Sequence, residues 1–252
     1  MRHTKGVLLF GNFPKIRPSL PKEIEDIYSE YYKENREGLT RASSLAQRME
    51  SWLHKQVAND VATSQDSAKV TLEIGAGNLN QLKYEATAQS YDIVEPFTDL
   101  YKGSPHLVRV RSRYKDISEV PSGCCYDRIT SIATLEHVCN LPEVIARSGL
   151  LLAQNGVLRA SVPSEGKLLW TLGWKLTTGL EFKFRHGLDY GLLMKHEHVN
   201  TVDEIEEALE YFFKDVECKV FGLSKSISFY RFYECRNPRN DKCREFSRTP
   251  GA

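Results

Sequence analysis

The stretch that most restricts the fold is LEIGAGNL at residues 72–79, where a short apolar run ends at two glycines one residue apart. Glycine at the end of a strand permits positive φ and lets a ligand approach the backbone closely. When a helix follows, its free N–H groups and the positive end of its dipole favour an anionic group. The stretch therefore predicts a strand, a tight turn and a helix, and it leaves open whether the turn binds anything.

Strand-like and helix-like segments alternate along the chain after residue 69. The expected strands are KVTLEI, YDIVE, LVRVR, YDRITSIA and VLRASVP, and the expected helices between them are NLNQLKYEATAQ, FTDLYK and NLPEVIARSGLLLAQNG, the last with Gly156 as its C-cap. Such alternation indicates a parallel sheet with helices on both faces. VECKVFGL and ISFYRFYEC then follow each other directly, which is typical of an antiparallel pair at a sheet edge. We therefore expect an α/β, doubly wound, mostly parallel sheet of seven strands.

Changes of pattern divide the chain into three parts. They are an N-terminal helical cap at 1–68, the α/β domain at 69–236 and a polar tail at 237–252, which we expect to be disordered. Helix-like patterns at 21–35 and after Thr40 are expected to fold as a lid over the ligand site. Residues 164–200 are expected to be an insertion beside the sheet, because their Gly, Trp, Phe and His follow no clean period. The alternation resumes at Thr201, which fits a capping box with Glu204.

The composition favours a soluble cytoplasmic protein. Lys and Arg total 34 against 33 Asp and Glu, so the formal net charge is +1, and no basic extension indicates a nucleic-acid partner. The six cysteines form no CxxC pair and indicate no disulfide framework. No apolar run approaches membrane-spanning length, and the first residues lack the cleavage site of a signal peptide. We therefore expect a reduced, cytoplasmic protein with neither a nucleic-acid nor a membrane partner.

An acidic residue further along the chain turns the glycine stretch into a nucleoside-site pattern. Glu95 ends the second apolar run, 20 residues after Gly75. The carboxyl ends of neighbouring parallel strands lie side by side, so this carboxylate can accept hydrogen bonds from both hydroxyls of a ribose. A dinucleotide site follows the same plan but adds a third glycine, where this chain has Asn80. The dehydrogenase interpretation is thereby weakened, and it stays open.

Five segments in order resemble the motifs of class I S-adenosylmethionine-dependent methyltransferases. They are LEIGAGNL, in which an acidic residue precedes G-x-G, then YDIVEP, YKDISEV, YDRITSIATLEHV with its Glu-His pair, and LAQNGVLRASVP. The resemblance covers about residues 69–163 and, more weakly, 200–235. One departure is Leu79, where many members have a small residue, and we expect it to alter the fit to the amino-acid part of the cofactor.

The resemblance implies a Rossmann-like domain with S-adenosyl-L-methionine as its cofactor. It places the ribose at Glu95, and the adenine amino group at Asp116 beside the amide of Ile117. The cofactor-binding residues that it implies are Glu73, Gly75, Gly77, Asn78, Glu95, Pro96, Asp116, Ile117 and Ala133. The insertion also resembles uncharacterised bacterial methyltransferases associated with surface-polysaccharide or specialised-metabolite genes, a looser likeness that says little about the acceptor.

Histidines supply most of the candidate residues for chemistry. Methyl transfer from a sulfonium is an in-line displacement that depends on orientation, and a general base matters when a hydroxyl proton must leave. The candidates are His137 and His198 as catalytic residues, and His186, Tyr190 and His196 as substrate-binding residues. A purely structural role is an open alternative for each of them. His196 and His198 form an HEH pair, yet a third and a fourth ligand are not evident, so we predict no metal site.

Several functions remain open at this point. The first is a methyltransferase acting on an oxygen or nitrogen of a small-molecule acceptor, with a sugar or sugar-linked metabolite favoured. The second is an NAD-dependent oxidoreductase on the same sheet, and the third is a non-catalytic relative that binds the nucleoside as a partner subunit. The intact acidic and glycine positions favour the first. A nucleic-acid methyltransferase is disfavoured because an Asn/Asp-Pro-Pro-aromatic motif is missing, and the sequence decides nothing between a monomer and a homodimer.

Overall fold

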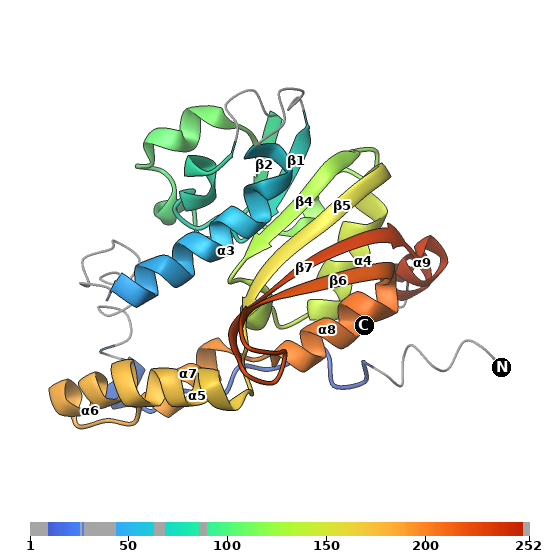
Figure 1. Ribbon diagram of the computed structural model, residues 1–252. Coiled ribbons are helices and arrows are strands. Elements are labelled where there is room, and N and C mark those ends of the chain that lie inside the picture. The colour runs from blue at the N-terminus through green and yellow to red at the C-terminus, as the bar shows by residue number, and fades with distance from the viewer. Residues whose placement is uncertain (1–9, 26, 28–43, 63–68, 86–89, 249–252) are drawn as a thin grey trace.

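A seven-stranded sheet in the order β3-β2-β1-β4-β5-β7-β6 forms the centre of the protein (Figure 1). The computed structural model describes all residues except 1–9, 26, 28–43, 63–68, 86–89 and 249–252. The strands are β1 (Val70–Ile74), β2 (Ser90–Val94), β3 (Val110–Tyr114), β4 (Tyr126–Ile132), β5 (Leu152–Pro163), β6 (Phe213–Gly222) and β7 (Ser228–Pro238). The first five pair in parallel, whereas β7 runs antiparallel to both β5 and β6. The structure thus confirms the predicted α/β, mostly parallel sheet with an antiparallel edge pair.

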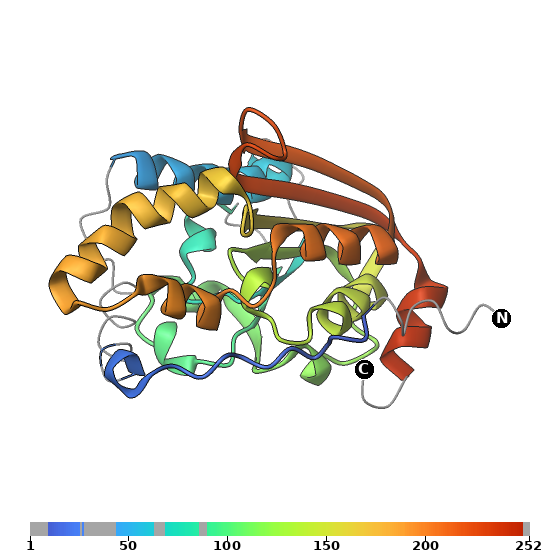
Figure 2. The ribbon, with the colours of Figure 1, turned by 90° about the horizontal axis from the view of Figure 1, so that it is seen from below.

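Helices cover both faces of the sheet. Helix α3 (Ser44–Ala62) lies over β4, β5 and β7 on one face, while α4 (Leu141–Leu151) and α8 (Val202–Phe212) lie on the other (Figures 1 and 2). Among the helices described, none combines the length and the apolar character that crossing a membrane requires. Because helices cover both of its faces, the sheet is doubly wound. A ligand site can form at the carboxyl ends of its strands, outside these two layers.

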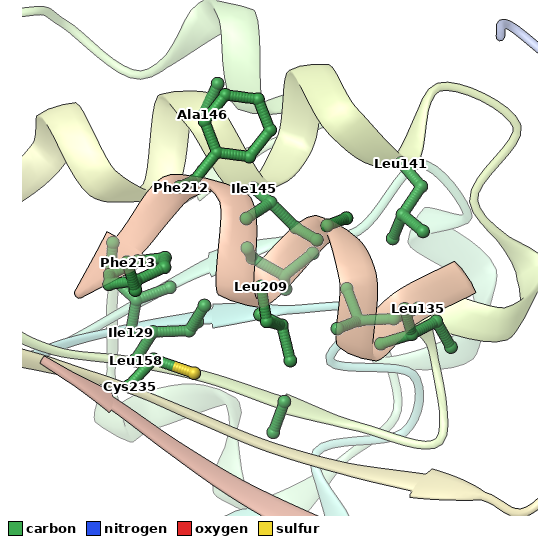
Figure 3. Close-up of a cluster of buried hydrophobic side chains, with 14 of the residues drawn as sticks. Ile129, Leu135, Leu141, Ile145, Ala146, Leu158, Leu209, Phe212, Phe213 and Cys235 are labelled. Carbon is green, nitrogen blue, oxygen red and sulfur yellow. The ribbon is translucent and has the colours of Figure 1, made fainter. Parts of the chain in front are cut away.

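The main core lies between the sheet and the layer of α4 and α8 (Figure 3). Ile129 of β4 and Leu158 of β5 belong to the same buried cluster as Ile145 of α4 and Leu209 of α8. The apolar face of α8 is fully buried and consists of Val202, Ile205, Leu209 and Phe212. Burial of each such side chain contributes about 1.5–3 kcal/mol, so this layer fixes the sheet on which the site is built.

The start of α8 is held by the capping box predicted from the sequence. Thr201 Oγ1 accepts a hydrogen bond from the Glu204 amide at 3.3 Å, and Glu204 Oε2 accepts one from the Thr201 amide at 2.8 Å. Lys15, from the N-terminal segment, donates to Glu204 Oε1 at 2.5 Å. The box satisfies two backbone N–H groups at the helix end and fixes where the insertion rejoins the α/β domain.

Helix α9 (Asn240–Arg248) corrects the expectation of a disordered tail. It packs beside α4, and its Cys243 and Phe246, one turn apart, are buried in the main core. The segment is polar on average, which led to the wrong prediction. Two apolar residues at helical spacing are enough to anchor a short helix when a buried surface is available to receive them.

The segment after the first glycine turn also differs from the prediction. Asn80–Lys83 forms only a four-residue 3-10 helix, preceded by Leu79 at φ 67°. A residue in the left-handed region does not continue into an α-helix, so the expected helix dipole aimed at an anion is not formed there. Leu79 is itself fully buried beside Ala76 and Leu82, and its side chain fills the core beneath the turn.

Two element boundaries were also predicted wrongly. The third strand begins at Val110 rather than at Leu107, because Pro105–Arg109 forms a 3-10 helix before it. Helix α4 ends at Leu151, and β5 begins directly after it, so Gly156 lies within the strand and does not cap the helix. In both places the helix or strand begins or ends at a residue that the apolar pattern does not indicate. Such errors of a few residues are common at the ends of helices and strands.

The insertion at 164–200 is helical, which corrects the expectation that its large side chains follow no clean period. Helix α5 (Leu168–Trp174), a π-helical turn (Lys175–Gly179) and α6 (Leu180–His186) follow one another and extend away from the sheet, and α7 (Tyr190–Glu197) leads back (Figure 1). Large apolar side chains do recur at every fourth residue, but they are exposed: Leu168, Leu172, Leu176, Leu180 and Phe184. The helical period was therefore present in the sequence, but the apolar side chains that form it face solvent instead of a core.

The N-terminal cap is described only in part. Residues 22–25 are helical, and Ile24 is buried with Phe182 and Leu193 of the insertion. Helix α3 is a layer of the sheet rather than a separate lid, although its middle residues reach the ligand edge. Residues 28–43, where further lid contacts were expected, lie outside the described residues, so the lid stays a prediction.

Candidate active site

A cavity of about 1130 Å³ opens at the carboxyl ends of the parallel strands β1 to β4. Ligands of open parallel sheets bind at this edge. All nine of the predicted cofactor residues line the cavity: Glu73, Gly75, Gly77, Asn78, Glu95, Pro96, Asp116, Ile117 and Ala133. The fold thus brings together around one space residues that come from four separate strand ends. Their role in binding a cofactor remains a prediction.

The two glycines of the turn after β1 serve different purposes. Gly75 has a φ of 73°, and a Cβ added there would lie 2.3 Å from the side chain of Thr134. Gly77 has a φ of 51°, and a Cβ added there would meet nothing within 4 Å. Gly75 therefore allows this turn to pack against the turn after β4, whereas Gly77 leaves open space for a ligand close to the backbone.

Glu95 connects the end of β2 with the glycine turn. Its Oε2 accepts a hydrogen bond from the Gly77 amide at 2.8 Å, and its Oε1 accepts one from the Phe97 amide at 3.0 Å. Asp116, at the end of β3, is held in a similar way by the Ser118 amide, which donates to Oδ1 at 2.8 Å. Backbone donors thus fix both predicted nucleoside-binding carboxylates at the edge of the cavity.

Glu73 is a deeply buried acid on the floor of the cavity. Its side chain is 2% exposed, and the Tyr91 hydroxyl donates a hydrogen bond to Oε2 at 3.0 Å. Burial raises the pKa of Glu73 well above its usual range, and the hydrogen bond from Tyr91 opposes that shift without cancelling it. The carboxyl group is therefore held in its neutral form over a wider pH range than an exposed glutamate.

A second cavity, of about 500 Å³, lies among the helices of the insertion. Tyr190 and His198, both predicted site residues, line it together with Trp174, whose ring centroid is 5.8 Å from that of Tyr190. The cations Lys175 and Lys183 also line it. The insertion thus carries an aromatic and partly basic pocket of its own, separate from the cavity at the strand ends.

The other two predicted substrate residues lie elsewhere. His196 lines the first cavity rather than the second, and its Nδ1 is 2.7 Å from the carbonyl oxygen of Pro18. His186 lines neither cavity and packs instead against Phe182, with ring centroids 4.9 Å apart. Its position at the end of α6 gives it a structural contact, which was the open alternative to substrate binding.

The linings of the two cavities touch at His137 and His198, a contact that we call the junction. His137 lines the first cavity and His198 the second, and their ring centroids are 4.8 Å apart at an interplanar angle of 77°. Asn200 ties together the chain segments that carry them, because its Nδ2 donates to the carbonyl oxygens of Leu135 at 2.8 Å and Val138 at 2.7 Å. The structure therefore places the two predicted catalytic histidines in contact at the junction.

Acidic groups set the protonation of this junction. Burial, and then the neighbouring His198, lower the pKa of His137 to about 4, so its ring is neutral near pH 7. Burial alone would lower the pKa of His198 as well, but the hydrogen bond to Glu165 and the charge of Glu136 raise it overall. Burial raises the pKa of Glu136 to about 7. Each of these closely spaced groups therefore affects the protonation of the others at the boundary of the two cavities.

Sequence reasoning assigned no role to several residues of the site. Glu136 stood beside His137 in the Glu-His pair, so its motif could have drawn attention to it. Glu165 and Arg17 had no local signal: Glu165 Oε2 lies 2.7 Å from His198 Nδ1, and Arg17 donates to the His137 carbonyl oxygen at 2.7 Å. His54 of α3 also lines the first cavity. These contacts join segments far apart in the chain, which spacing cannot show.

Comparison with known proteins rests on structure, because no protein-family model and no curated protein matches this sequence. A CurJ carbon methyltransferase superposes with a TM-score of 0.53 at 19% identity, over 79% of this chain and 56% of that one. The N-methyltransferase NodS from Bradyrhizobium japonicum WM9, in complex with S-adenosyl-L-homocysteine, gives 0.53 at 13% identity over 79% and 90%. An O-methyltransferase family protein from Burkholderia thailandensis gives 0.53 at 13% identity over 93% and 70%. The chain spans little more than half of the CurJ protein.

These likenesses establish the class of fold. The chain has the class I S-adenosylmethionine-dependent methyltransferase fold, with the strand order 3-2-1-4-5-7-6 and an antiparallel β7. The three similar structures are named as carbon, nitrogen and oxygen methyltransferases. A shared fold is therefore compatible with different acceptor atoms, and the acceptor must be argued from the site itself.

Proposed function

We propose that this protein is an S-adenosylmethionine-dependent methyltransferase that transfers a methyl group to an oxygen or nitrogen of a small-molecule acceptor, with a sugar or sugar-linked metabolite favoured. The observation that carries the proposal is the gathering of all nine residues of the family motifs around one cavity. The fold, shared with NodS in its complex with S-adenosyl-L-homocysteine, supports the same class of cofactor. An oxidoreductase would require NAD in this cavity, and a direct binding comparison separates the two.

The cofactor is assigned to the cavity at the strand ends. Glu95 accepts hydrogen bonds from the ribose hydroxyls, and Asp116 and the Ile117 amide read the adenine. Gly77 leaves room for the amino-acid part, above Glu73, and Gly75 lets the turn pack against Thr134. When bound, S-adenosyl-L-methionine supplies a methyl group on a positively charged sulfur that is a good leaving group. The task of the chain is then to bind, to orient and to exclude water.

The acceptor is assigned to the second cavity. A molecule seated against Trp174 and Tyr190 would lie on the His198 side of the contact between His137 and His198, where the methyl group would meet it. Orientation of the reacting atoms can contribute on the order of 7–11 kcal/mol in favourable cases. We propose that the two histidines contact the acceptor atom that becomes methylated. One of them accepts the proton that this atom loses.

The partners, the location and the oligomeric state of the protein are the remaining parts of the proposal. The acceptor pocket is the size of a small-molecule site, so the partners proposed are small molecules rather than nucleic acid or a membrane. We propose a cytoplasmic location. Light scattering of the purified protein would distinguish a monomer from a homodimer.

Substitution of Glu95 tests the cofactor assignment. Glu95→Ala is expected to weaken binding of S-adenosyl-L-methionine about 100-fold, because two charge-assisted hydrogen bonds to the ribose are lost. The matched control is Asp99→Ala, which removes an exposed carboxylate in the same loop outside the cavity lining. Calorimetry gives the affinities and thermal unfolding checks the fold. An affinity for Glu95→Ala equal to that of the control would contradict the assignment.

A further inference from the structure

The junction of the two cavities has the donor set of a metal centre. Glu136, His137 and His198 each offer one ligand atom, and these atoms lie within 4.8 Å of one another. Glu136 and His137 come from the short helix Leu135–His137 after β4, whereas His198 directly follows α7. Two imidazoles and one carboxylate are a common ligand set for divalent zinc, iron and related ions. The sequence could not show this set, because its third member lies about 60 residues away in the chain.

Both histidines are oriented as metal ligands are. His198 Nδ1 lies 2.7 Å from Glu165 Oε2, and His137 Nδ1 lies 2.8 Å from the carbonyl oxygen of Glu197. A proton on each Nδ1 donates to these oxygens and leaves each Nε2 as the atom available to a ligand. Metal-bound histidines nearly always have their second nitrogen held by a carboxylate or a backbone carbonyl in this way.

Glu136 supplies a second, independent observation. Its side chain is 1% exposed, and within the described part of the chain its buried Oε2 has no hydrogen-bond partner. The other oxygen, Oε1, is 3.7 Å from His137 Nε2. A buried carboxylate oxygen without a partner is costly, and a cation placed among the three ligand atoms would satisfy it.

The surrounding charges favour a cation with two positive charges. The carboxylates of Glu136, Glu165 and Glu197 all act on this pair of histidines, while Arg17 is the cation that acts on His137. Carboxylates thus outnumber cations around the two histidines. Such surroundings attract a divalent ion, and three protein ligands would leave coordination positions open toward the two cavities.

We propose that Glu136, His137 and His198 bind one divalent transition-metal ion, and that this ion holds the acceptor atom at the junction. The placing of the acceptor rests on the proposed function, whereas the binding of the ion does not. A metal-coordinated hydroxyl loses its proton more readily than a free one, which is the requirement for methylating oxygen. In place of the histidines, a water molecule then accepts the acceptor's proton, because Nε2 of each histidine binds the ion and each Nδ1 already donates to Glu165 or Glu197. His196, the other histidine of the HEH pair, lies in the cofactor cavity and takes no part.

The test is binding of Co²⁺ and Zn²⁺ to the full chain after treatment with a chelator. The expected result is one ion per chain, with a visible absorption band whose intensity differs from that of hydrated Co²⁺ and reports binding to the protein. Glu136→Gln and His198→Gln are expected to weaken Co²⁺ binding at least about 100-fold, while the control His106→Gln, which is outside the cluster, leaves it unchanged. Glu165→Gln keeps all three ligands and is expected to weaken binding about 10- to 100-fold, since it removes the group that orients His198.

The outcomes separate this inference from the proposed function. Binding of S-adenosyl-L-methionine to the metal-free protein is measured on every variant, and it also reports that each variant is folded. Wild-type protein that binds the cofactor but no Co²⁺, or Glu136→Gln and Glu165→Gln variants that bind Co²⁺ like the wild type, would overturn the metal site. Protein that binds Co²⁺ through this cluster but no S-adenosyl-L-methionine would support the site and overturn the function instead.

Discussion

The cofactor edge, meaning the cavity at the carboxyl ends of β1 to β4, and the insertion at 164–200 are built in different ways. At the cofactor edge the backbone shapes the site, through positive φ at Gly75 and Gly77 and the amides that hold Glu95. In the insertion, side chains on α5 and α7 such as Trp174 and Tyr190 shape the cavity. A site made by backbone leaves a readable motif, whereas a site made by helix side chains does not.

The two regions also differ in the amino-acid substitutions that we expect them to tolerate. At the cofactor edge, the side chain of Thr134 leaves no space for a Cβ at Gly75. The helices α5 and α6 expose a row of large apolar side chains and extend beyond the sheet. We therefore expect substitutions to be tolerated less well beside Gly75 than along this exposed row.

The largest effect is expected from paired glycine substitutions in the two regions. Gly75→Ala combines a positive φ with a Cβ 2.3 Å from Thr134, so it should cost about 2–4 kcal/mol of unfolding free energy and weaken cofactor binding. Gly187→Ala, at the end of α6, has a similar φ of 72° but open space around the Cβ, and should cost about 1 kcal/mol. Urea unfolding measures both. If Gly75→Ala and Gly187→Ala lost the same unfolding free energy, the contrast between a confined cofactor edge and a tolerant insertion would be contradicted.

A pH profile compares buried and exposed carboxylates of the two regions. Because the folded-state pKa of Glu73 is raised above its ordinary value of 4.5, the unfolded chain releases this proton first as the pH rises. Its stabilising effect is complete below the unfolded pKa and declines, by about 1.4 kcal/mol per pH unit, until the folded pKa is reached. Glu73→Gln should therefore give a flatter curve of unfolding free energy above about pH 5.

The matched control for that profile is Glu181→Gln, which replaces an exposed glutamate of α6 in the insertion. Its profile should follow the wild type, since both states of an exposed carboxylate are hydrated alike. A Glu73→Gln profile that also follows the wild type would show that Glu73 is not buried as an uncharged group, and the floor of the cavity would have to be described differently.

The smallest effect is expected where the insertion rejoins the α/β domain. Thr201→Ala removes the capping box with Glu204 and should lower the free energy of unfolding by about 1 kcal/mol, without changing cofactor affinity. Thr201→Ser retains a hydroxyl cap and should remain within a few tenths of a kcal/mol of the wild type. A change in cofactor affinity with Thr201→Ala would mean that the two regions are coupled, contrary to the contrast between them.

Much of the cofactor edge could be predicted from the sequence because strand order converts spacing into proximity. Glu95 lies 20 residues after Gly75, yet parallel pairing of β1 with β2 brings its carboxylate to the Gly77 amide. The capping box of α8 was equally readable, since it depends on residues three apart. Features decided locally, or by the order of strands, follow from the spacing of residues along the chain.

The remaining features depend on tertiary contacts. The polar tail forms α9 because Cys243 and Phe246 find a buried surface on α4. The junction of Glu136 with His198 arises because Asn200 ties the end of α7 to the turn after β4. Each of these depends on what lies nearby in space, and spacing along one chain gives no measure of that.

The central claim is that the cavity at the cofactor edge binds S-adenosyl-L-methionine. Calorimetric titration of the wild-type protein with S-adenosyl-L-methionine, S-adenosyl-L-homocysteine and NAD tests it most directly. We expect one molecule of either S-adenosyl compound to bind per chain, with NAD binding at least about 100-fold more weakly. Binding of NAD alone would contradict the account, because it would assign the same glycines and Glu95 to a dinucleotide.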